Sequence, residues 1–454
     1  MTIYFDLSTS ARWSGHAVGI VRTEAELARR LRRFADDAGG YCIYVPNEGR
    51  FRLLPDDKAE EILAGRLVID FQEAPAGLTA RPTLRRRIRD LILSRPRLYQ
   101  TIQRLRGLSF SLEQIAEVRR SETALVAVNC LPAMRQLDEV ASEPLHLAPD
   151  VLIISGGLDW EHKNMRALYR LKKASGFKYA AIIYDLIPIL YPQYVVPAYV
   201  NLLRDYFGEL FWVVDYALSI SQRTELDMLE YCASIGVKPP LSAHFPLGSD
   251  LSKSAMAEAE LPEALHGKKF ALFVSTIEPR KNHRILYQAW ERALRQGRID
   301  PQECRLVFVG MQGWNTGDFL NELSANPITN TTIIRLSGIS DAELRALYQQ
   351  AEFSVFPSIY EGYGLPVAES LGYGCPCICS NTGSLPEIAG DLVQYVDPGD
   401  PIAWMDAMAA AFAAPEELRA QRELIKTRFH AISWDNAAGL FFTKLQGVMA
   451  RAEA

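Results

Sequence analysis

Two carboxylates carry the clearest chemical signal in the chain. Glu361 and Glu369 bracket the segment EGYGLPVAE, with Gly362 and Gly364 between them, and an apolar run ends just before it. Pro366 suits the first turn of a helix, so backbone N–H groups and the positive end of the helix dipole would face a bound anion. The glycines allow a ligand to approach the backbone closely. The segment therefore predicts a site for an anionic ligand, in which the two carboxylates accept hydrogen bonds from hydroxyl groups of that ligand.

A pair of adjacent cations forms the second signal. Arg280 and Lys281 follow an apolar run in the segment FVSTIEPRKN. Cations at the carboxyl end of a strand face the crevice of an open α/β sheet. A guanidinium fork beside an ammonium point charge suits a diphosphate. Adjacent basic residues in a loop are more often merely solvated, so this pattern alone leaves that alternative open.

A glycine turn in the segment SGHAVGIVR is the third and weakest signal. Gly15 and Gly19 precede an amphipathic helical pattern. The spacing differs from GxGxxG, and no acid on a second strand completes a dinucleotide-binding fingerprint. A structural turn is the simpler interpretation of this segment taken alone.

Alternating strands and helices must position these residues. Apolar strand patterns separated by helical patterns predict parallel sheets covered on both faces, in two doubly wound domains. The predicted strands are residues 3–7, 41–45, 124–129, 151–155, 179–184 and 216–221, then 270–276, 305–310, 333–337, 353–357, 376–380 and 393–396. Predicted helices include residues 284–295, 341–350 and 401–413, the second beginning with a capping box from Ser340 to Glu343.

A polar stretch without strand pattern divides the chain. We expect a first Rossmann-like domain over residues 1–247, a linker over 248–269, a second domain over 270–430 and a C-terminal helical segment over 431–454. The length of 454 residues also favours more than one domain.

Composition excludes several classes of protein. Apolar residues make up 48% and charged residues 23%, as in globular proteins. The net charge of -5 offers no global basic field for nucleic acid. Seven cysteines are too sparse for a disulfide scaffold, and the spacing of Cys375, Cys377 and Cys379 lacks the second pair of a zinc site. We expect buried strand cysteines, no metal and a reducing, cytoplasmic setting.

Membrane contact is a separate question. No signal peptide is expected at the N-terminus, and three prolines within the uncharged residues 186–203 exclude a continuous spanning helix there. Residues 81–106 contain nine arginines and one acid, with apolar residues at near-helical spacing. This pattern fits either a helix pair on an anionic membrane surface or a solvated helical excursion.

Taken in order, the motifs resemble a known family. With LVFVGMQGW, LSGISDAELRALYQQAEFSVFPSIYEGYGLPVAESLGYG and SLPEIAGD added to the two segments above, the second half resembles the donor-binding domain of glycosyltransferase family 4, which has the GT-B fold. The resemblance continues more loosely in the first half through VGIVRTEAEL, IIYDLIPILYP, SISQRTELDML and FPLGSD, whereas residues 46–120 resemble nothing known to us. It implies two Rossmann-like domains facing a central cleft, with the C-terminal helix packing back on the first.

The resemblance also implies roles for single residues. Glu361 matches the glutamate that contacts the donor sugar, Glu369 the one that binds the ribose, and Arg280 with Lys281 the diphosphate clamp. The remaining donor-binding matches are Gly19, Ile339, Gly362, Tyr363, Gly364 and Leu365.

One dipeptide departs from the family pattern. Tyr184-Asp185 stands where many relatives have His-Asp. A tyrosine with a reference pKa of about 10 is a poorer proton shuttle. Asp185 stays a catalytic candidate, whereas His16, His162 and His283 are weaker ones, each better explained as a structural or surface histidine.

The resemblance implies retaining, metal-independent transfer of a sugar from a nucleotide diphosphate donor, without a further cofactor. We expect a hexose, mannose or a deoxyhexose first, with a GDP-mannose-like donor and a glycan acceptor in surface polysaccharide or lipid-linked oligosaccharide synthesis. The expected location is the cytoplasm or the inner face of the membrane. A sugar-nucleotide epimerase of the same architecture and a non-catalytic sugar-nucleotide-binding subunit are the alternatives.

Overall fold

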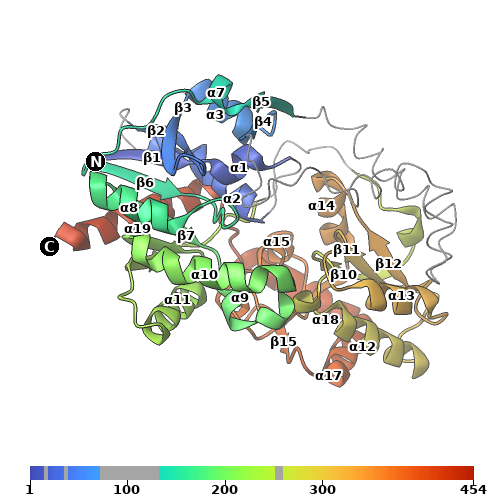
Figure 1. Cartoon of the computed structure of the whole chain (residues 1–454). Coiled ribbons are helices and arrows are strands. Elements are labelled where there is room, and N and C mark those ends of the chain that lie inside the picture. Colours follow the sequence, from blue (N-terminus) through green and yellow to red (C-terminus); the bar gives the residue numbers. More distant parts are fainter. Residues whose placement is uncertain (15–18, 35–38, 72–131, 251–258, 454) are drawn as a thin grey trace, which may run out of the picture.

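Two α/β domains, each built on its own large sheet, make up the molecule (Figure 1). The computed structural model describes residues 1–14, 19–34, 39–71, 132–250 and 259–453. The predicted strand at 124–129, the basic residues 81–106 and His16 lie outside the described residues. Within them, the predicted pair of doubly wound sheets is confirmed.

The first sheet has the order β3-β2-β1-β6-β7-β8-β9 and is parallel except where β2 meets β3. Its strands are β1 (Thr2–Asp6), β2 (Gly40–Val45), β3 (Arg50–Leu54), β6 (Val151–Ser155), β7 (Lys178–Ile183), β8 (Tyr216–Ser219) and β9 (Leu241–His244). A separate parallel pair joins β4 (Leu67–Asp70) to β5 (Ala133–Gln136). The sequence patterns missed β3 and β9, the two edge strands of the large sheet. Each has a single neighbouring strand and a half-exposed, partly polar sequence.

Helices cover both faces of this sheet. They are α1 (Ser8–Arg12), α2 (Gly19–Ala28), η1 (Leu31–Arg33), α3 (Asp56–Leu63), α7 (Leu137–Val140), α8 (Met165–Ser175), α9 (Ile187–Leu190), η2 (Pro192–Tyr194), α10 (Pro197–Val213) and α11 (Gln222–Ser234). Prolines break the uncharged residues 186–203 into α9, η2 and the start of α10, as predicted. Among the described helices, none combines the length and apolarity needed to cross a membrane.

The second sheet is parallel throughout, in the order β12-β11-β10-β13-β14-β15. Its strands are β10 (Lys269–Val274), β11 (Cys304–Val309), β12 (Ile333–Leu336), β13 (Phe353–Phe356), β14 (Cys377–Ser380) and β15 (Gln394–Val396). Its helical segments are η3 (Glu263–Leu265), η4 (Pro279–Lys281), α12 (His283–Arg295), α13 (Gly317–Ala325), α14 (Asp341–Gln350), α15 (Leu365–Gly372), α16 (Leu385–Ala389), α17 (Pro401–Ala413) and α18 (Pro415–Arg428). Ser340 and Glu343 form the predicted capping box of α14.

The last helix, α19 (Trp434–Glu453), returns to the first domain. Its buried Trp434, Phe441 and Leu445 belong to the hydrophobic cluster that contains Phe5 of β1 and Ile154 of β6. Figure 1 shows this helix, in red, among the blue and green elements of the first domain. The chain therefore crosses between the domains twice, once near residue 250 and once before α19.

Strand order reverses once in each sheet. The reversal lies between β1 and β6 in the first sheet and between β10 and β13 in the second. At such a point the loops at the carboxyl ends of neighbouring strands diverge to opposite faces and leave a crevice where ligands bind. In the second sheet these loops contain the two segments that the sequence singled out, residues 275–282 and 357–364.

Candidate functional site

Three hydrogen bonds fix the loop that carries the two cations. After β10 the chain makes the short η4 turn, and Asn282 adopts a left-handed conformation with φ of 63° at the start of α12. Its side-chain amide donates to the carbonyl of Pro357 at 3.1 Å and to that of Pro398 at 2.8 Å. The N–H of Ile359 donates to the carbonyl of Arg280 at 2.9 Å. These bonds hold the η4 turn against the loops that follow β13 and β15.

The loop after β13 is held from the other side by α16 and the residues before it. Ser384 Oγ donates to the Tyr363 carbonyl at 2.6 Å, and the Ser384 N–H to that of Glu361 at 3.2 Å. A Cβ on Gly383 would lie 2.8 Å from the backbone nitrogen of Glu361, so only glycine fits there. Gly364 has φ of 105°, which also requires glycine, and α15 begins directly after it. The glycines thus place Glu361 before a helix N-terminus, as the sequence predicts.

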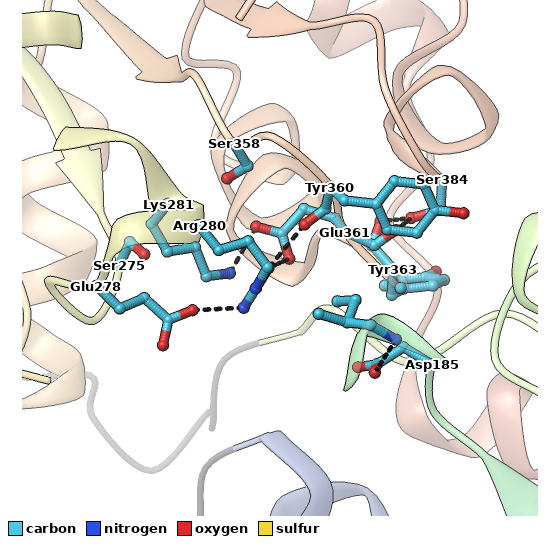
Figure 2. A network of polar contacts seen from close by, with 12 residues as sticks. Asp185, Ser275, Glu278, Arg280, Lys281, Ser358, Tyr360, Glu361, Tyr363 and Ser384 are labelled. Carbon is cyan, nitrogen blue, oxygen red and sulfur yellow. Dashed lines mark hydrogen bonds and ion pairs between the residues drawn. The ribbon is translucent and has the colours of Figure 1, made fainter. Parts of the chain in front are cut away.

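Glu361 lies between the two predicted cations (Figure 2). Its Oε1 accepts a hydrogen bond from Lys281 Nζ at 2.5 Å, and its Oε2 accepts one from Arg280 Nη1 at 3.0 Å. Arg280 also donates to the Tyr360 carbonyl at 2.7 Å and to Glu278 Oε1 at 2.6 Å. The structure therefore brings the two separate sequence signals into one ion-pair network.

Burial and the neighbouring charges shift the pKa values of this network in opposite directions. Burial alone would raise the pKa of Glu361, but Lys281 and Arg280 outweigh it and hold the pKa at about 2. Burial lowers the pKa of Lys281, against the pull of Glu361, and raises the pKa of Glu278, against the pull of Arg280. The side chains of Arg280, Lys281 and Glu361 keep 14%, 16% and 12% of their surface exposed. Glu361 is thus a fixed anion that a ligand can still reach.

The first domain contributes Asp185 to the same crevice. Burial raises the pKa of its carboxyl, while Arg280 opposes that change. Its Oδ1 accepts a hydrogen bond from the N–H of Ile187 at 3.0 Å, and Figure 2 shows it across from the Arg280–Glu361 network. Its neighbour Tyr184 points elsewhere, since the hydroxyl donates to the Gly156 carbonyl at 2.5 Å inside the first domain. Tyr184 therefore fills a structural position rather than serving as a proton shuttle in the crevice.

Glu369 lies on α15 and faces the other domain. Its Oε1 is 3.5 Å from Arg22 Nη1 on α2, and its Oε2 accepts a hydrogen bond from the Tyr348 hydroxyl at 3.4 Å. Burial raises the pKa of Glu369 to about 7, although Arg22 opposes this rise. Ile339, one of the predicted donor-binding residues, packs against the hydrophobic cluster that contains Tyr348. These contacts place Glu369 and Ile339 in one neighbourhood, and their roles remain predictions.

Three further sequence candidates have clear positions. Gly19, with φ of 53°, begins α2 one turn before Arg22 and so stands at the domain boundary. His283 is 2% exposed between Phe273 and Phe308, and burial lowers its pKa to about 3. The latter is a core side chain, which matches its structural interpretation. His162 is partly exposed on the first domain beside Glu161.

Sequence reasoning missed several residues that complete the site. Glu278 pairs with Arg280 inside the quoted motif FVSTIEPRKN, whereas Arg22, also in a quoted motif, has its partner Glu369 in the other half of the chain. Ser221 and Thr224 also lie in a quoted motif, SISQRTELDML, and they contact the loop containing Glu361 from the first domain. Only their polar character next to a predicted strand end could have marked them.

Comparisons with known proteins bear on the family and on the fold. Residues 258–428 match the family model of glycosyl transferases group 1. The chain is 36% identical to the O-antigen chain mannosyltransferase B of Escherichia coli over 175 residues, which are 37% of this chain and 43% of that protein. It is 29% identical to the serotype-specific mannosyltransferase WbdA of Escherichia coli over 49% of this chain and 28% of that protein. An MMP alpha-(1->4)-mannosyltransferase of Mycolicibacterium hassiacum is 32% identical over 34% of this chain and 37% of that protein.

Solved structures with a similar fold include Alr3699/HepE of Anabaena in complex with UDP, with a TM-score of 0.54 at 13% identity, over 99% of this chain and 100% of that one. The trehalose 6-phosphate synthase of Burkholderia multivorans has a TM-score of 0.51 at 18% identity, over 76% of this chain and 78% of that one. These likenesses confirm the predicted GT-B fold. The match with the family model confirms, for the second half, a resemblance to glycosyl transferases of group 1. The chain spans less than half the length of the curated relatives it matches first.

Proposed function

We propose that this chain, whose second half matches the group 1 glycosyl transferases, is a retaining glycosyltransferase. It would move a hexose from a nucleotide diphosphate sugar to a glycan acceptor. One observation carries the proposal: Glu361 is held between Arg280 and Lys281 at the point where the strand order of the second sheet reverses. Ligands of open α/β sheets bind at such points.

The charges of the network suggest that different residues bind different parts of the donor. Arg280 and Lys281 would share their N–H donors with the oxygens of the diphosphate, and the positive end of α15 would face the same anion. Glu361, ionised above a pH of about 2, would turn toward the hydroxyls of the sugar. Glu369 would accept hydrogen bonds from the ribose. With these cations in place, we propose that the reaction needs no metal ion.

Transfer breaks the bond between the anomeric carbon and the leaving phosphate oxygen and forms a bond from that carbon to the acceptor oxygen. We propose that the departing phosphate oxygen takes the proton of the acceptor, so that no tyrosine base is required. The protein then orients both substrates and stabilises the charge that develops on the leaving diphosphate. Asp185 stays a candidate for contact with the transferred sugar.

We propose mannose, or a deoxyhexose, as the sugar and a GDP-mannose-like donor. The relatives named above support mannose, because three of them are described as mannosyltransferases. The O-antigen in the name of the first supports an acceptor in surface polysaccharide synthesis. A peripheral position at an anionic membrane surface, through residues 81–106, would suit a lipid-linked acceptor. Replacing Arg85, Arg86 and Arg87 with Gln should then weaken sedimentation with anionic vesicles.

The test is turnover by the purified protein. We would incubate it with GDP-mannose and other hexose nucleotides, with and without a glycan acceptor, and measure released nucleoside diphosphate and the anomeric configuration of the product. Release of nucleoside diphosphate with a product that keeps the donor's configuration is expected. An altered sugar nucleotide without release would point to the epimerase alternative. Binding without any turnover would point to the non-catalytic subunit.

A further inference from the structure

Helix α11 of the first domain contacts the loop that carries Glu361. This helix begins at Gln222 and follows β8, whose carboxyl end faces the second domain. Ser221 Oγ donates to the carbonyl of Gly362 at 2.7 Å, directly after Glu361 in the chain. Thr224 Oγ1 lies 3.2 Å from the same carbonyl oxygen. One side of Glu361 is therefore tied to the first turn of α11.

The other side of Glu361 is tied one turn further along the same helix. The Tyr360 hydroxyl donates to Asp227 Oδ2, and Asp227 is also paired with Arg223 at 2.6 Å. Tyr360 is 8% exposed, and Asp227 is 4% exposed. Both chain neighbours of Glu361 thus have a hydrogen-bond partner on α11, and both bonds cross the domain boundary.

A carboxylate of the second domain completes the contact. Glu387 of α16 accepts hydrogen bonds from the N–H groups of Gln222 and Arg223, at 2.8 Å and 2.6 Å. These N–H groups belong to the first turn of α11, which has no partners within the helix for them. A carboxylate there is also stabilised by the helix dipole. Glu387 of the second domain therefore caps α11, and α11 in turn contacts the loop of the second domain that carries Glu361.

The close approach at this boundary requires glycine. A Cβ on Gly362 would lie 2.8 Å from Asp185 Cβ and would overlap the Tyr184 carbonyl oxygen. Ser221 and Thr224 are 3% and 1% exposed, although their loop partners come from the other domain. Opening of the domains would expose these hydroxyls and release the loop. The position of Glu361 is therefore coupled to closure.

We propose that α11 is the positioning element of the catalytic loop, with Ser221, Asp227 and Glu387 as positioning residues that hold Tyr360 and Gly362 and so aim Glu361 at the donor sugar. The inference rests on the proposed function and deepens it. None of the three residues touches the transferred group in this role. Ser221 holds the Gly362 carbonyl, Asp227 holds the Tyr360 hydroxyl, and Glu387 holds the first turn of α11. All three contacts form only when the two domains meet.

The first test uses Tyr360→Phe and Ser221→Ala. Each removes one hydroxyl from the contact, and each should lower kcat about tenfold, the effect of losing about 1.4 kcal/mol of positioning. The affinity for GDP, measured by titration calorimetry, should change by less than about twofold, because the phosphate cations are untouched. Ser221→Thr keeps the hydroxyl and the helix cap, and it should restore kcat.

Matched controls carry the same chemical change elsewhere. Tyr41→Phe removes the hydroxyl of an equally buried tyrosine, which donates to the Ala28 carbonyl at 3.1 Å in the first domain. Ser234→Ala acts at the far end of α11, where Ser234 Oγ donates to the Tyr231 carbonyl at 2.7 Å. Both controls should keep the parental kcat. Parental kcat in Tyr360→Phe and Ser221→Ala as well would overturn the proposal.

A second measurement does not depend on turnover. Amide hydrogen exchange of the peptide spanning residues 359–364 should rise in Tyr360→Phe and Ser221→Ala and stay parental in the two controls. If the parent protein turns over no sugar nucleotide, the proposed function fails, but this exchange still tests the positioning of the loop. Unchanged exchange in all four variants would overturn it independently.

Discussion

Two buried glutamates at the two strand-order reversals have opposite electrostatics. Glu24 of α2 lies beside the reversal of the first sheet and is fully buried, and burial raises its pKa to about 8 despite a hydrogen bond from the Ser10 N–H at 2.7 Å. Glu361, at the reversal of the second sheet, is also largely buried, but its pKa falls to about 2. The difference is the neighbouring charge: two cations contact Glu361, whereas the nearby Asp6 further raises the pKa of Glu24.

The charged side chains of the two regions also differ in their exposure to solvent. In the first, Lys163 Nζ lies 2.6 Å from Asp6 Oδ2 and 2.8 Å from Ser155 Oγ, and the side chains of the ion pair are 1% and 0% exposed. Gly157 closes the region, because a Cβ there would lie 2.7 Å from Glu24 Oε2. In the second region Arg280, Lys281 and Glu361 each keep a solvent-facing part, whereas Glu278 is buried. Sealed charges of this kind hold a fold together, whereas reachable ones can bind a ligand.

The largest expected effect is on the sealed ion pair. Lys163→Ala leaves Asp6 buried without its partner, and the loss should lower the free energy of unfolding by about 3–5 kcal/mol. Urea unfolding followed by circular dichroism measures it. The control is Lys426→Ala, whose pair with Glu423 at 2.7 Å is on the surface and should contribute less than about 1 kcal/mol. Equal loss in both variants would contradict the comparison.

Glu361→Gln should have the largest effect on catalysis. The substitution keeps the shape of the side chain but removes the charge, so kcat should fall about 10²-fold, as for a lost positioned charge. Steady-state kinetics and a thermal melt on the same sample separate catalysis from folding. Glu322→Gln, which removes a surface pair with Arg284, is the control with parental kinetics. Near-parental kcat in Glu361→Gln would remove the centre of the site assignment.

The raised pKa of Glu24 predicts a pH dependence of stability. A carboxyl that titrates near 4.5 when unfolded and near 8 when folded favours the folded state below the lower value, and that contribution is lost as the pH rises toward 8. Stability should fall by up to about 1.4 kcal/mol per pH unit in this window. Glu24→Gln should flatten the dependence in urea melts at pH 5, 6, 7 and 8. A parental slope in the variant would show that another group is responsible.

Glu369→Gln should change substrate binding more than turnover. The ribose does not change during transfer, so its contacts stabilise ground state and transition state alike. We expect KM for the donor to rise several-fold, roughly 1 kcal/mol, with kcat nearly parental. Because burial raises the pKa of Glu369 to about 7, the parental KM should rise as the pH falls below 7 and the ionised carboxylate is lost. The variant should lack this dependence, and a kcat loss equal to the KM effect would argue against a ribose contact.

The smallest expected effect is that of a chelator. If Arg280 and Lys281 carry the charge of the diphosphate, EDTA should leave turnover within experimental error of the untreated enzyme. Turnover with and without EDTA, then with added manganese, measures this. Loss of activity that manganese restores would assign part of the diphosphate charge to a metal.

Local patterns were sufficient for the central strands of both sheets and for one half of the site, but not for β3, β4, β5 and β9. Strands and helices follow from hydrophobic periodicity, and the predicted helices at 341–350 and 401–413 match α14 and α17 residue for residue. Glu361 and Arg280 stood out because glycines, a proline and strand ends surround them in the sequence. These signals are local, since a helix start or a strand end depends on only a few neighbouring residues.

Tertiary structure decided which of these groups meet and which become sealed. The Arg22–Glu369 pair and the bond from Ser221 to Gly362 join residues from opposite halves of the chain, so no local pattern contains both partners. No local pattern shows where the Tyr184 side chain points either, since its hydroxyl contacts Gly156, 28 residues earlier, instead of the crevice. Residue type determined that Glu24 and Glu361 could each carry a charge. Their surroundings after folding set one pKa to about 8 and the other to about 2, because burial and neighbouring cations exist only once the chain has packed.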